Sequence, residues 1–279
     1  MEPKLQRRVQ RYGWDLAAPV YDSLWQTQLA GVQAKLLECA ALAPGERVLD
    51  IACGTGLVTL KAAKAVGPTG QVLGVDLSEK MVSLAQHQAR EGGLVNVTFE
   101  RMDAENLALP DSSIDVALCS LGLMYLPEPE RALCEMRRIL RPGGRVVISV
   151  WGERSRCGWA SLFGIVDDEV VSDVCPLFFR LGQPDVLARA CTDAQLKVMV
   201  QRRLRAELEY ASGDDAWNAA LAGGPVALAW SRFDDQVRLR VRSRYLESID
   251  PWRIGSAYAV PAEFVVVVTR DLRQQRGAE

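Results

Sequence analysis

The sequence predicts an α/β fold, a doubly wound and mostly parallel sheet that carries a helical cap. Three observations predict it. Apolar strand segments alternate with helical segments, a glycine loop follows the first strand, and the alternation stops after Trp151. Strands that alternate with helices in this way are typical of a doubly wound parallel sheet. The predicted strands are residues 47–52, 71–76, 97–101, 114–119 and 145–150.

Helical patterns are found both before the first strand and between the strands of the core. Leucine and valine repeat at helical spacing between residues 29 and 37, and Pro44-Gly45 ends the pattern. We expect residues 1–43 to form N-terminal helices that cover the edge of the sheet. Residues 44–151 are the predicted core, with helices at 58–66, 78–91 and 128–140.

After Trp151 the regular alternation is lost. Residues 152–279 are predicted to hold cap insertions together with the last two strands of the sheet. The expected pieces are an irregular stretch at 152–182, a short helix at 184–190, an extended stretch at 196–209, helical structure at 214–249 and a strand at 263–269.

The composition excludes two classes of partner. The 33 Lys and Arg residues nearly balance the 35 Asp and Glu residues, and the formal net charge is −2. A nucleic acid or an anionic membrane would need a basic patch, so we expect no nucleic acid partner. No apolar run approaches the roughly 20 residues that span a bilayer, and residues 1–8 lack the apolar stretch of a secretory signal. We therefore expect a cytoplasmic protein without a membrane span, whose oligomeric state the sequence does not indicate.

The glycine loop is the sharpest signal for a ligand. Asp50-Ile-Ala-Cys-Gly-Thr-Gly56 stands where the first strand turns into a helix. Glycines there let a ligand approach the backbone, and the free N–H groups of a helix start favour an anionic group such as a carboxylate. A dinucleotide-binding loop would place its first glycine where Ala52 stands. A purely structural turn is the alternative.

Polar residues also end the next three strands. Asp76 follows the glycine loop by about 20 residues, a spacing at which an acidic side chain accepts hydrogen bonds from ribose hydroxyls. Asp103-Ala104 follows the third strand and Cys119-Ser120 ends the fourth. Open α/β sheets bind ligands at the carboxyl ends of their strands, so these positions should meet. A lone solvated loop carboxylate is the alternative for Asp76 and Asp103.

Several segments resemble the successive motifs of one enzyme family. They are Val48-Leu-Asp-Ile-Ala-Cys-Gly-Thr-Gly56, Val75-Asp-Leu-Ser-Glu-Lys-Met81, Asp103-Ala-Glu-Asn-Leu-Ala-Leu-Pro110, Ser112-Ser-Ile-Asp-Val116 and Leu140-Arg-Pro-Gly-Gly144. They resemble class I (Rossmann-like) S-adenosylmethionine-dependent methyltransferases, in particular the ubiquinone/menaquinone biosynthesis C-methyltransferase subgroup. The resemblance covers residues 10–151 well, is weak through 152–250 and returns faintly in the last strand. It implies that 44–151 binds S-adenosylmethionine and that the cap receives a substrate.

The resemblance also implies roles for single residues. Asp50 and the loop backbone would hold the methionine end, Asp76 the ribose hydroxyls and Asp103 the adenine amino group. Cys119 would lie beneath the sulfonium, and Tyr21 would close over the cofactor. The implied cofactor-binding set is Tyr21, Asp50, Ala52, Gly54, Thr55, Gly56, Asp76, Leu77, Met81, Met102, Asp103, Ala104, Cys119 and Ser120. Ala52 departs from the glycine that many members carry, a change we expect the loop to tolerate.

The implied reaction is an in-line transfer of the methyl group to O, N or C of a small, largely apolar acceptor. Because the sulfonium is already activated, the protein's main tasks are to align the acceptor at about 3 Å and to exclude water. A phenol or an activated carbon would still need a base, for which Tyr21, Tyr125 or a cap carboxylate are the candidates. His87, the one histidine of the chain, shares a helix face with polar residues and is expected at the surface.

Three alternatives stay open from the sequence. An arsenite or thiol-acceptor methyltransferase would use Cys157, Cys175 and Cys191. A nicotinamide dehydrogenase would share the sheet but lacks its third glycine, and a non-catalytic S-adenosylmethionine-binding module would bind without turnover. The seven cysteines show no pair spacing typical of zinc, so we expect buried free thiols and no metal.

The cap raises two further expectations. Its aromatic residues either fill a core or wall an apolar pocket for the acceptor; they are Trp159, Phe163, Phe178 and Phe179. A site that admits an acceptor and then excludes water needs a lid, so we expect residues 1–30 and 152–182 to be the mobile parts.

Overall fold

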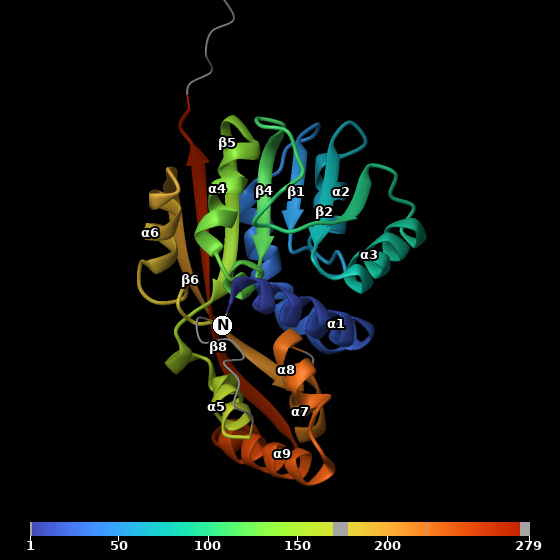
Figure 1. Ribbon diagram of the computed structural model, residues 1–279, viewed down its shortest axis with the longest axis vertical. Coiled ribbons are helices and arrows are strands. Elements are labelled where there is room, and N and C mark those ends of the chain that lie inside the picture. Colours follow the sequence, from blue (N-terminus) through green and yellow to red (C-terminus); the bar gives the residue numbers. More distant parts are fainter. Residues whose placement is uncertain (1, 170–177, 222, 274–279) are drawn as a thin grey trace, which may run out of the picture.

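The computed structural model describes residues 2–169, 178–221 and 223–273 (Figure 1). The strands are β1 (Arg47–Ile51), β2 (Gln71–Asp76), β3 (Val97–Arg101), β4 (Ile114–Ser120), β5 (Leu140–Trp151), β6 (Leu196–Tyr210), β7 (Arg253–Ile254) and β8 (Ala257–Asp271). The helices are α1 (Pro3–Ala40), α2 (Thr59–Val66), α3 (Glu79–Glu91), α4 (Pro129–Ile139), α5 (Ser161–Asp167), α6 (Val186–Asp193), α7 (Gly213–Leu221), α8 (Gly224–Trp230) and α9 (Asp235–Ile249).

One mixed sheet organises these elements. Its order is β3-β2-β1-β4-β5-β8-β6, with β7 paired to β8. The pairings among β1 to β5 are parallel, and β8 runs antiparallel to both β5 and β6. The predicted doubly wound, mostly parallel Rossmann-like sheet is therefore confirmed.

The order of the strands reverses between β1 and β4. The chain leaves β1 toward β2 on one side and leaves β4 toward β5 on the other. Ligands of open α/β sheets bind in the crevice at such a switch point, outside the carboxyl ends of the strands. The apolar side chains of Val48, Leu49 and Ile51 are buried on both faces of β1, as parallel strands covered by helices require.

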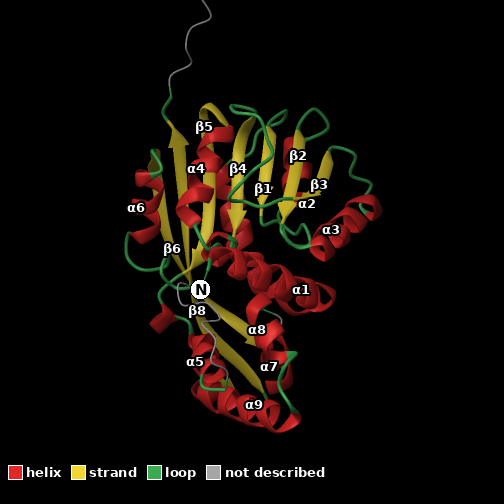
Figure 2. Ribbon diagram, in the orientation of Figure 1, coloured by secondary structure: helices red, strands yellow, loops and turns green. Residues whose placement is uncertain are grey.

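The last two long strands continue beyond the rest of the sheet. β5 pairs with β8 only as far as Trp151 opposite Phe264, whereas β6 and β8 stay paired as far as Tyr210 opposite Tyr258. Figure 2 shows this two-stranded ribbon running on past β5, with α5, α7 and α9 around it. The ribbon thus joins the cap to the sheet.

The structure differs from the sequence prediction at several element bounds. The stretch expected to be irregular contains α5, and the helical region expected at 214–249 is three helices. α1 is a single helix that continues through Pro19. The predicted strand at 263–269 starts earlier, because Tyr258 to Ala262 pair with β6 and Ala257 pairs with β7. The division into 1–43, 44–151 and 152–279 stays a prediction.

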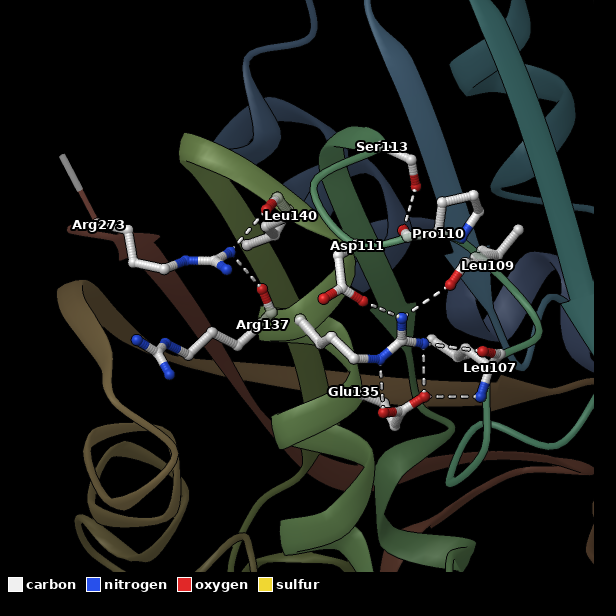
Figure 3. Close-up of polar contacts among 10 residues, drawn as sticks. Leu107, Leu109, Pro110, Asp111, Ser113, Glu135, Arg137, Leu140 and Arg273 are labelled. Carbon is white, nitrogen blue, oxygen red and sulfur yellow. Dashed lines mark hydrogen bonds and ion pairs between the residues drawn. The ribbon is translucent and has the colours of Figure 1, made fainter. Parts of the chain in front are cut away.

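One arginine of α4 holds the loop that follows β3. The Arg138 guanidinium donates to the carbonyls of Leu107 and Leu109 at 2.8 Å each and to Asp111 Oδ1 at 2.7 Å. It also donates to both carboxylate oxygens of Glu135, at 2.8 Å each, which lowers the pKa of Glu135. Figure 3 shows these oxygens converging on the guanidinium, so the loop is pinned where it approaches the crevice.

Candidate functional site

A cavity of about 790 Å³, counting its open mouth, lies at the switch point between β1 and β4. Ten of the fourteen residues in the predicted binding set line it: Tyr21, Ala52, Gly54, Asp76, Leu77, Met81, Met102, Asp103, Ala104 and Ser120. The carboxyl ends of β1, β2 and β4 and the loop after β3 contribute eight of these residues, while α1 contributes Tyr21 and α3 contributes Met81. Segments separated by up to 100 residues in the sequence are thus brought to one crevice.

Four residues of the predicted set lie outside the lining. Asp50 is buried beneath the loop, and Cys119 is fully buried in β4. Thr55 donates its hydroxyl to Asp22 of α1 at 2.5 Å. A side chain at Gly56 would meet Phe99 and Ala85 at 3.3 Å, so this glycine permits α3 and β3 to pack against the loop. These four residues therefore do not line the cavity, and their part in binding stays a prediction.

The glycine loop itself is left-handed at three of its residues. Ala52, Gly54 and Gly56 have φ of 55°, 55° and 90°. A Cβ built at Gly54 would meet nothing within 4 Å, consistent with its place on the cavity wall. Ala52 adopts a conformation that glycine reaches without strain, so the departure from the family pattern is tolerated at a local cost. Gly122 leaves room for the side chain of Ala52, because a Cβ atom built at Gly122 would lie only 2.4 Å from the Cβ of Ala52.

Asp76 ties the end of β2 to the glycine loop. Its Oδ2 accepts the backbone N–H of Gly54 at 2.9 Å, and its Oδ1 accepts that of Ser78 at 2.9 Å. Burial raises the pKa of this carboxyl group. Each carboxylate oxygen has one lone pair beyond these bonds, so the group can accept two more hydrogen bonds.

Asp50 is a buried acid with an unsatisfied oxygen. Its Oδ2 accepts the Thr59 hydroxyl at 2.6 Å, whereas Oδ1 has no hydrogen-bond partner within the described residues. Desolvation by burial raises the pKa of Asp50 to about 7. A cationic group above the loop would stabilise its charged form.

The helix α1 lines the cavity and is tethered at three points. Figure 1 shows this helix lying past the carboxyl ends of β1 and β2. Near its start, Arg7 pairs with Glu105, with Glu128 at 2.8 Å and with Asp103 at 3.3 Å. Asp15 accepts the hydroxyl of Ser78 at 2.6 Å.

The third tether is Asp22, which accepts hydrogen bonds from Thr55 and from Gln88, the latter at 2.6 Å. All three tethers join α1 to loops or helices that follow β1, β2, β3 or β4. Opening the cavity on this side therefore requires α1 to leave these partners.

The sequence analysis missed the other α1 residues at the cavity. Arg7, Gln10 and Trp14 line it together with Tyr21. Their spacing of three, four and seven residues places them on one helix face, and this pattern could have identified them. Their partners lie far away in the sequence, so spacing alone could not show what that face covers.

A second cavity of about 540 Å³ adjoins the first and is mostly aromatic. The two share four lining residues: Trp14, Tyr21, Leu121 and Tyr125. The ring centroid of Trp14 lies 5.8 Å from that of Tyr21 and 5.0 Å from that of Tyr125, both edge to face. These rings form the boundary between the cavities.

The structure divides the cap aromatics into two groups. Trp159 and Phe163 line the second cavity. Phe178 and Phe179 lie outside its lining and pack behind these rings, with centroid separations of 5.0 to 5.8 Å. Phe178 and Phe179 thus fill a core, whereas Trp159 and Phe163 line a cavity, whose use by an acceptor stays a prediction.

Tyr21, Cys157 and Cys191 are held in their neutral forms. Burial, then the charges of Asp22 and Asp76, raise the pKa of Tyr21, so it stays a phenol at neutral pH and its role as a base is not favoured. Burial raises the pKa of Cys157 to about 11 and of Cys191 to about 12.

Two further residues complete this comparison. Cys175, the third thiol of the metalloid alternative, lies outside the described residues. His87 is exposed and lies 3.4 Å from Glu91, as expected for a surface residue. No helix in the described ranges is long and apolar enough to cross a membrane.

The comparisons with known proteins agree with this geometry. A family model described as a methyltransferase domain matches residues 48–144. The ubiquinone/menaquinone biosynthesis C-methyltransferase of Ectopseudomonas mendocina is 42% identical over 113 residues, which cover 40% of this chain and 44% of that protein. The chain therefore matches less than half the length of this relative.

Solved structures extend the likeness to nearly the whole chain. The 4+2 cyclase SpnF has a TM-score of 0.64 at 22% identity, covering 94% of this chain and 95% of that one. A putative methyltransferase from Bacillus halodurans has a TM-score of 0.61 at 18% identity, covering 87% and 100%. At these identities the likeness shows the fold, which one of the two neighbours uses as a cyclase.

Proposed function

We propose, from the premise that residues 48–144 form a class I S-adenosylmethionine-dependent methyltransferase domain, that the chain transfers a methyl group from S-adenosylmethionine to a small, largely apolar acceptor. The observation that carries this proposal is the pair of adjoining cavities. The first has the features of a cofactor site, and the second adjoins it at four shared lining residues.

The residues of the first cavity fit the cofactor. The open space above Gly54 and the unpartnered Oδ1 of Asp50 support a methionine end at the glycine loop, with its ammonium group near Asp50. The free lone pairs of Asp76 support the ribose hydroxyls there. Asp103 and Ala104, on the loop that Arg138 pins, would meet the adenine. When bound, the cofactor supplies an activated methyl group.

The second cavity supports an apolar acceptor. Its described lining contains no Asp, Glu, Lys, Arg or His. A charged acceptor would lose its hydration there without gaining an opposite charge. An uncharged molecule would be held against the shared rings, with water excluded and the reacting atom directed at the first cavity. Because relatives are named C-methyltransferases, carbon is the first acceptor atom to test.

A matched pair of cap variants tests the acceptor site. Phe163→Ala should raise the KM for the acceptor several-fold and leave the affinity for S-adenosylhomocysteine unchanged, because Phe163 lines the second cavity. Phe179 packs behind Trp159 and Phe163, outside the cavity lining, so Phe179→Ala should lower the melting temperature and change the KM for the acceptor little. Equal effects of both variants on the KM would contradict the assignment.

A screen with labelled S-adenosylmethionine tests the reaction. We expect transfer to small phenols, quinols or enols and none to tRNA or histones. Transfer to tRNA or histones alone would overturn the acceptor proposal. Absence of S-adenosylhomocysteine binding by calorimetry would overturn the function itself. A cytoplasmic location and the absence of a nucleic acid partner remain predictions.

A further inference from the structure

A buried carboxylate lies where the two-stranded ribbon of β6 and β8 leaves the rest of the sheet. Glu263 of β8 is 3% exposed, and its Oε2 accepts a hydrogen bond from Nη1 of Arg203, in the neighbouring β6, at 2.7 Å. The same oxygen accepts the backbone N–H of Glu153 at 3.1 Å, and Nε of Arg156 lies 3.5 Å from Oε1. A buried carboxylate needs a cation and hydrogen bonds, so these partners fix where the side chain lies.

Arg203 extends this contact to a third segment of the chain. Its Nη2 donates to the carbonyl of Gly182 at 2.8 Å, so one guanidinium joins the segment before α6 to β8. Gly182 lies directly against the turn after β5, because a Cβ built at Gly182 would lie 2.2 Å from the carbonyl oxygens of Trp151 and Gly152. The rigid, planar guanidinium makes both bonds at once, a geometry that a lysine ammonium group does not reproduce.

The segments that meet at this pair carry aromatic residues of the second cavity. Trp151 ends β5 next to Gly152, whose N–H donates to the Glu263 carbonyl at 2.6 Å, and Trp159 follows in the turn before α5. Both tryptophans line the second cavity, and their ring centroids are 4.8 Å apart. Phe264, the neighbour of Glu263 in β8, packs on Trp151 with a centroid separation of 4.5 Å. The turn that the pair holds therefore lies between the two rings in the chain.

We propose that Arg203 and Glu263, through the bridge to Gly182 and to the turn after β5, are positioning residues that set where Trp151 and Trp159 lie in the lining of the second cavity. Neither Arg203 nor Glu263 lines either cavity, so the pair acts through this turn and not by touching a ligand. The use of the cavity by an acceptor rests on the function proposed above, whereas the positions of the two rings can be measured without it.

The other end of β8 provides a matched arginine (Figure 3). Arg273 donates to Asp271 Oδ2 at 2.5 Å and to the carbonyls of Arg137 and Leu140 at 2.8 and 2.7 Å. Asp271 is 1% exposed, so this arginine also joins a buried carboxylate of β8 to another segment, and it lines neither cavity. Arg203→Ala and Arg273→Ala should therefore both lower the melting temperature, and only the first should alter the cavity lining.

Fluorine NMR of the chain labelled with 5-fluorotryptophan measures the two rings without a ligand. The signals of Trp151, Trp159 and Trp217 are assigned by replacing each tryptophan with Phe. In Arg203→Ala the signals of Trp151 and Trp159 should move from their wild-type positions, and that of Trp217 on α7 should stay. In Arg273→Ala all three should stay. Unmoved Trp151 and Trp159 signals in Arg203→Ala, or equal movement in both variants, overturn the proposal.

Arg203→Lys separates the charge from the bridge and serves if the alanine variant does not fold. A lysine keeps a cation beside Glu263 but lacks the planar fork that also reaches Gly182. The melting temperature should therefore stay closer to that of the wild type than in Arg203→Ala, while the Trp151 and Trp159 signals still move. Wild-type signals in Arg203→Lys would overturn the proposed bridge.

Kinetics distinguish the positioning role from the proposed function. With an acceptor found by the labelled screen, Arg203→Ala should raise the KM for the acceptor several-fold, with a smaller change in kcat and in the affinity for S-adenosylhomocysteine. Arg273→Ala should leave this KM unchanged. An unchanged KM in Arg203→Ala, alongside moved tryptophan signals, overturns the positioning role and leaves methyl transfer intact. A chain whose signals move as expected but which methylates no acceptor contradicts the proposed function and leaves the control of the ring positions intact.

Discussion

Asp76 Oδ2 accepts the backbone N–H of Gly54 at 2.9 Å and so joins the end of β2 to the glycine loop after β1. The same carboxylate holds the N–H of Ser78, which caps α3. One side chain therefore shapes two walls of the first cavity before any ligand arrives. The ribose contact proposed for Asp76 and its contacts within the fold therefore involve the same carboxylate, so its removal should affect both ligand binding and stability.

Replacing Asp76 with Ala should weaken S-adenosylhomocysteine binding by about 2–4 kcal/mol, because two charge-assisted hydrogen bonds are lost. It should also lower the free energy of unfolding, since two backbone N–H groups lose their acceptor. Calorimetry and thermal melting measure the two effects. Glu100→Ala, at an exposed position of the neighbouring β3, is the control and should change neither. Unchanged affinity in Asp76→Ala would remove the ribose assignment.

The pKa of Asp50, raised by burial to about 7, predicts two pH dependences. The folded protein binds a proton more tightly than the unfolded chain, whose Asp titrates near 3.9. The stabilising contribution of the protonated form is therefore lost as pH rises from about 4 through 7. Asp50→Asn should remove this part of the stability profile in denaturant titrations.

Cofactor binding should show the opposite trend with pH. A ligand ammonium pairs with the charged carboxylate, so affinity for S-adenosylhomocysteine should rise between pH 6 and 8 in the wild type. In Asp50→Asn the rise should disappear. An identical pH profile for the two proteins would show that the ammonium group lies elsewhere.

The two glycines that flank Thr55 should respond differently to substitution. A side chain at Gly54 enters the open cavity, so Gly54→Val should abolish ligand binding, with a left-handed strain of about 1–2 kcal/mol. A side chain at Gly56 crowds Phe99 and Ala85, so Gly56→Val should mainly destabilise the fold. A Gly56→Val protein with wild-type stability would contradict the packing role.

Arg7 should hold the first turns of α1 against the loops that follow β3 and β4, because it pairs with Glu105 and Glu128 there. Arg7→Ala leaves Glu105, which is 1% exposed, without its cation, so the first turns of α1 should open more readily by about 1–3 kcal/mol. Hydrogen exchange of residues 3–20 should accelerate, and cofactor should slow it again. The neighbouring exposed Arg8 provides the control, Arg8→Ala. Equal protection with and without cofactor in the wild type would count against α1 as a lid.

Much of the fold was predictable because its signals are local. The five parallel strands are short apolar runs, and the glycine loop, Ser78 and Pro44-Gly45 mark turns with specific backbone requirements. The ends of β8 and β6 were harder to predict, because each strand is extended there only by pairing with the other. The partner residues lie far apart in the sequence, so no local pattern indicates the pairing. The helix α5 was also hard to predict, because its seven residues are too few for a helical spacing of apolar residues to be distinguished from irregular structure.

The sequence by itself determined the doubly wound sheet, the glycine loop and the acidic residues at the strand ends, because each follows from spacing within a few residues. Only the tertiary structure decided that Gly56 packs against α3 and β3, that Arg7 locks α1 over the cavity, and that Trp25 and Trp159 border one apolar space. These contacts join segments that lie some 30 to more than 100 residues apart. Their energy comes from burial and charge pairing that exist only once the chain is folded, so no local pattern records them.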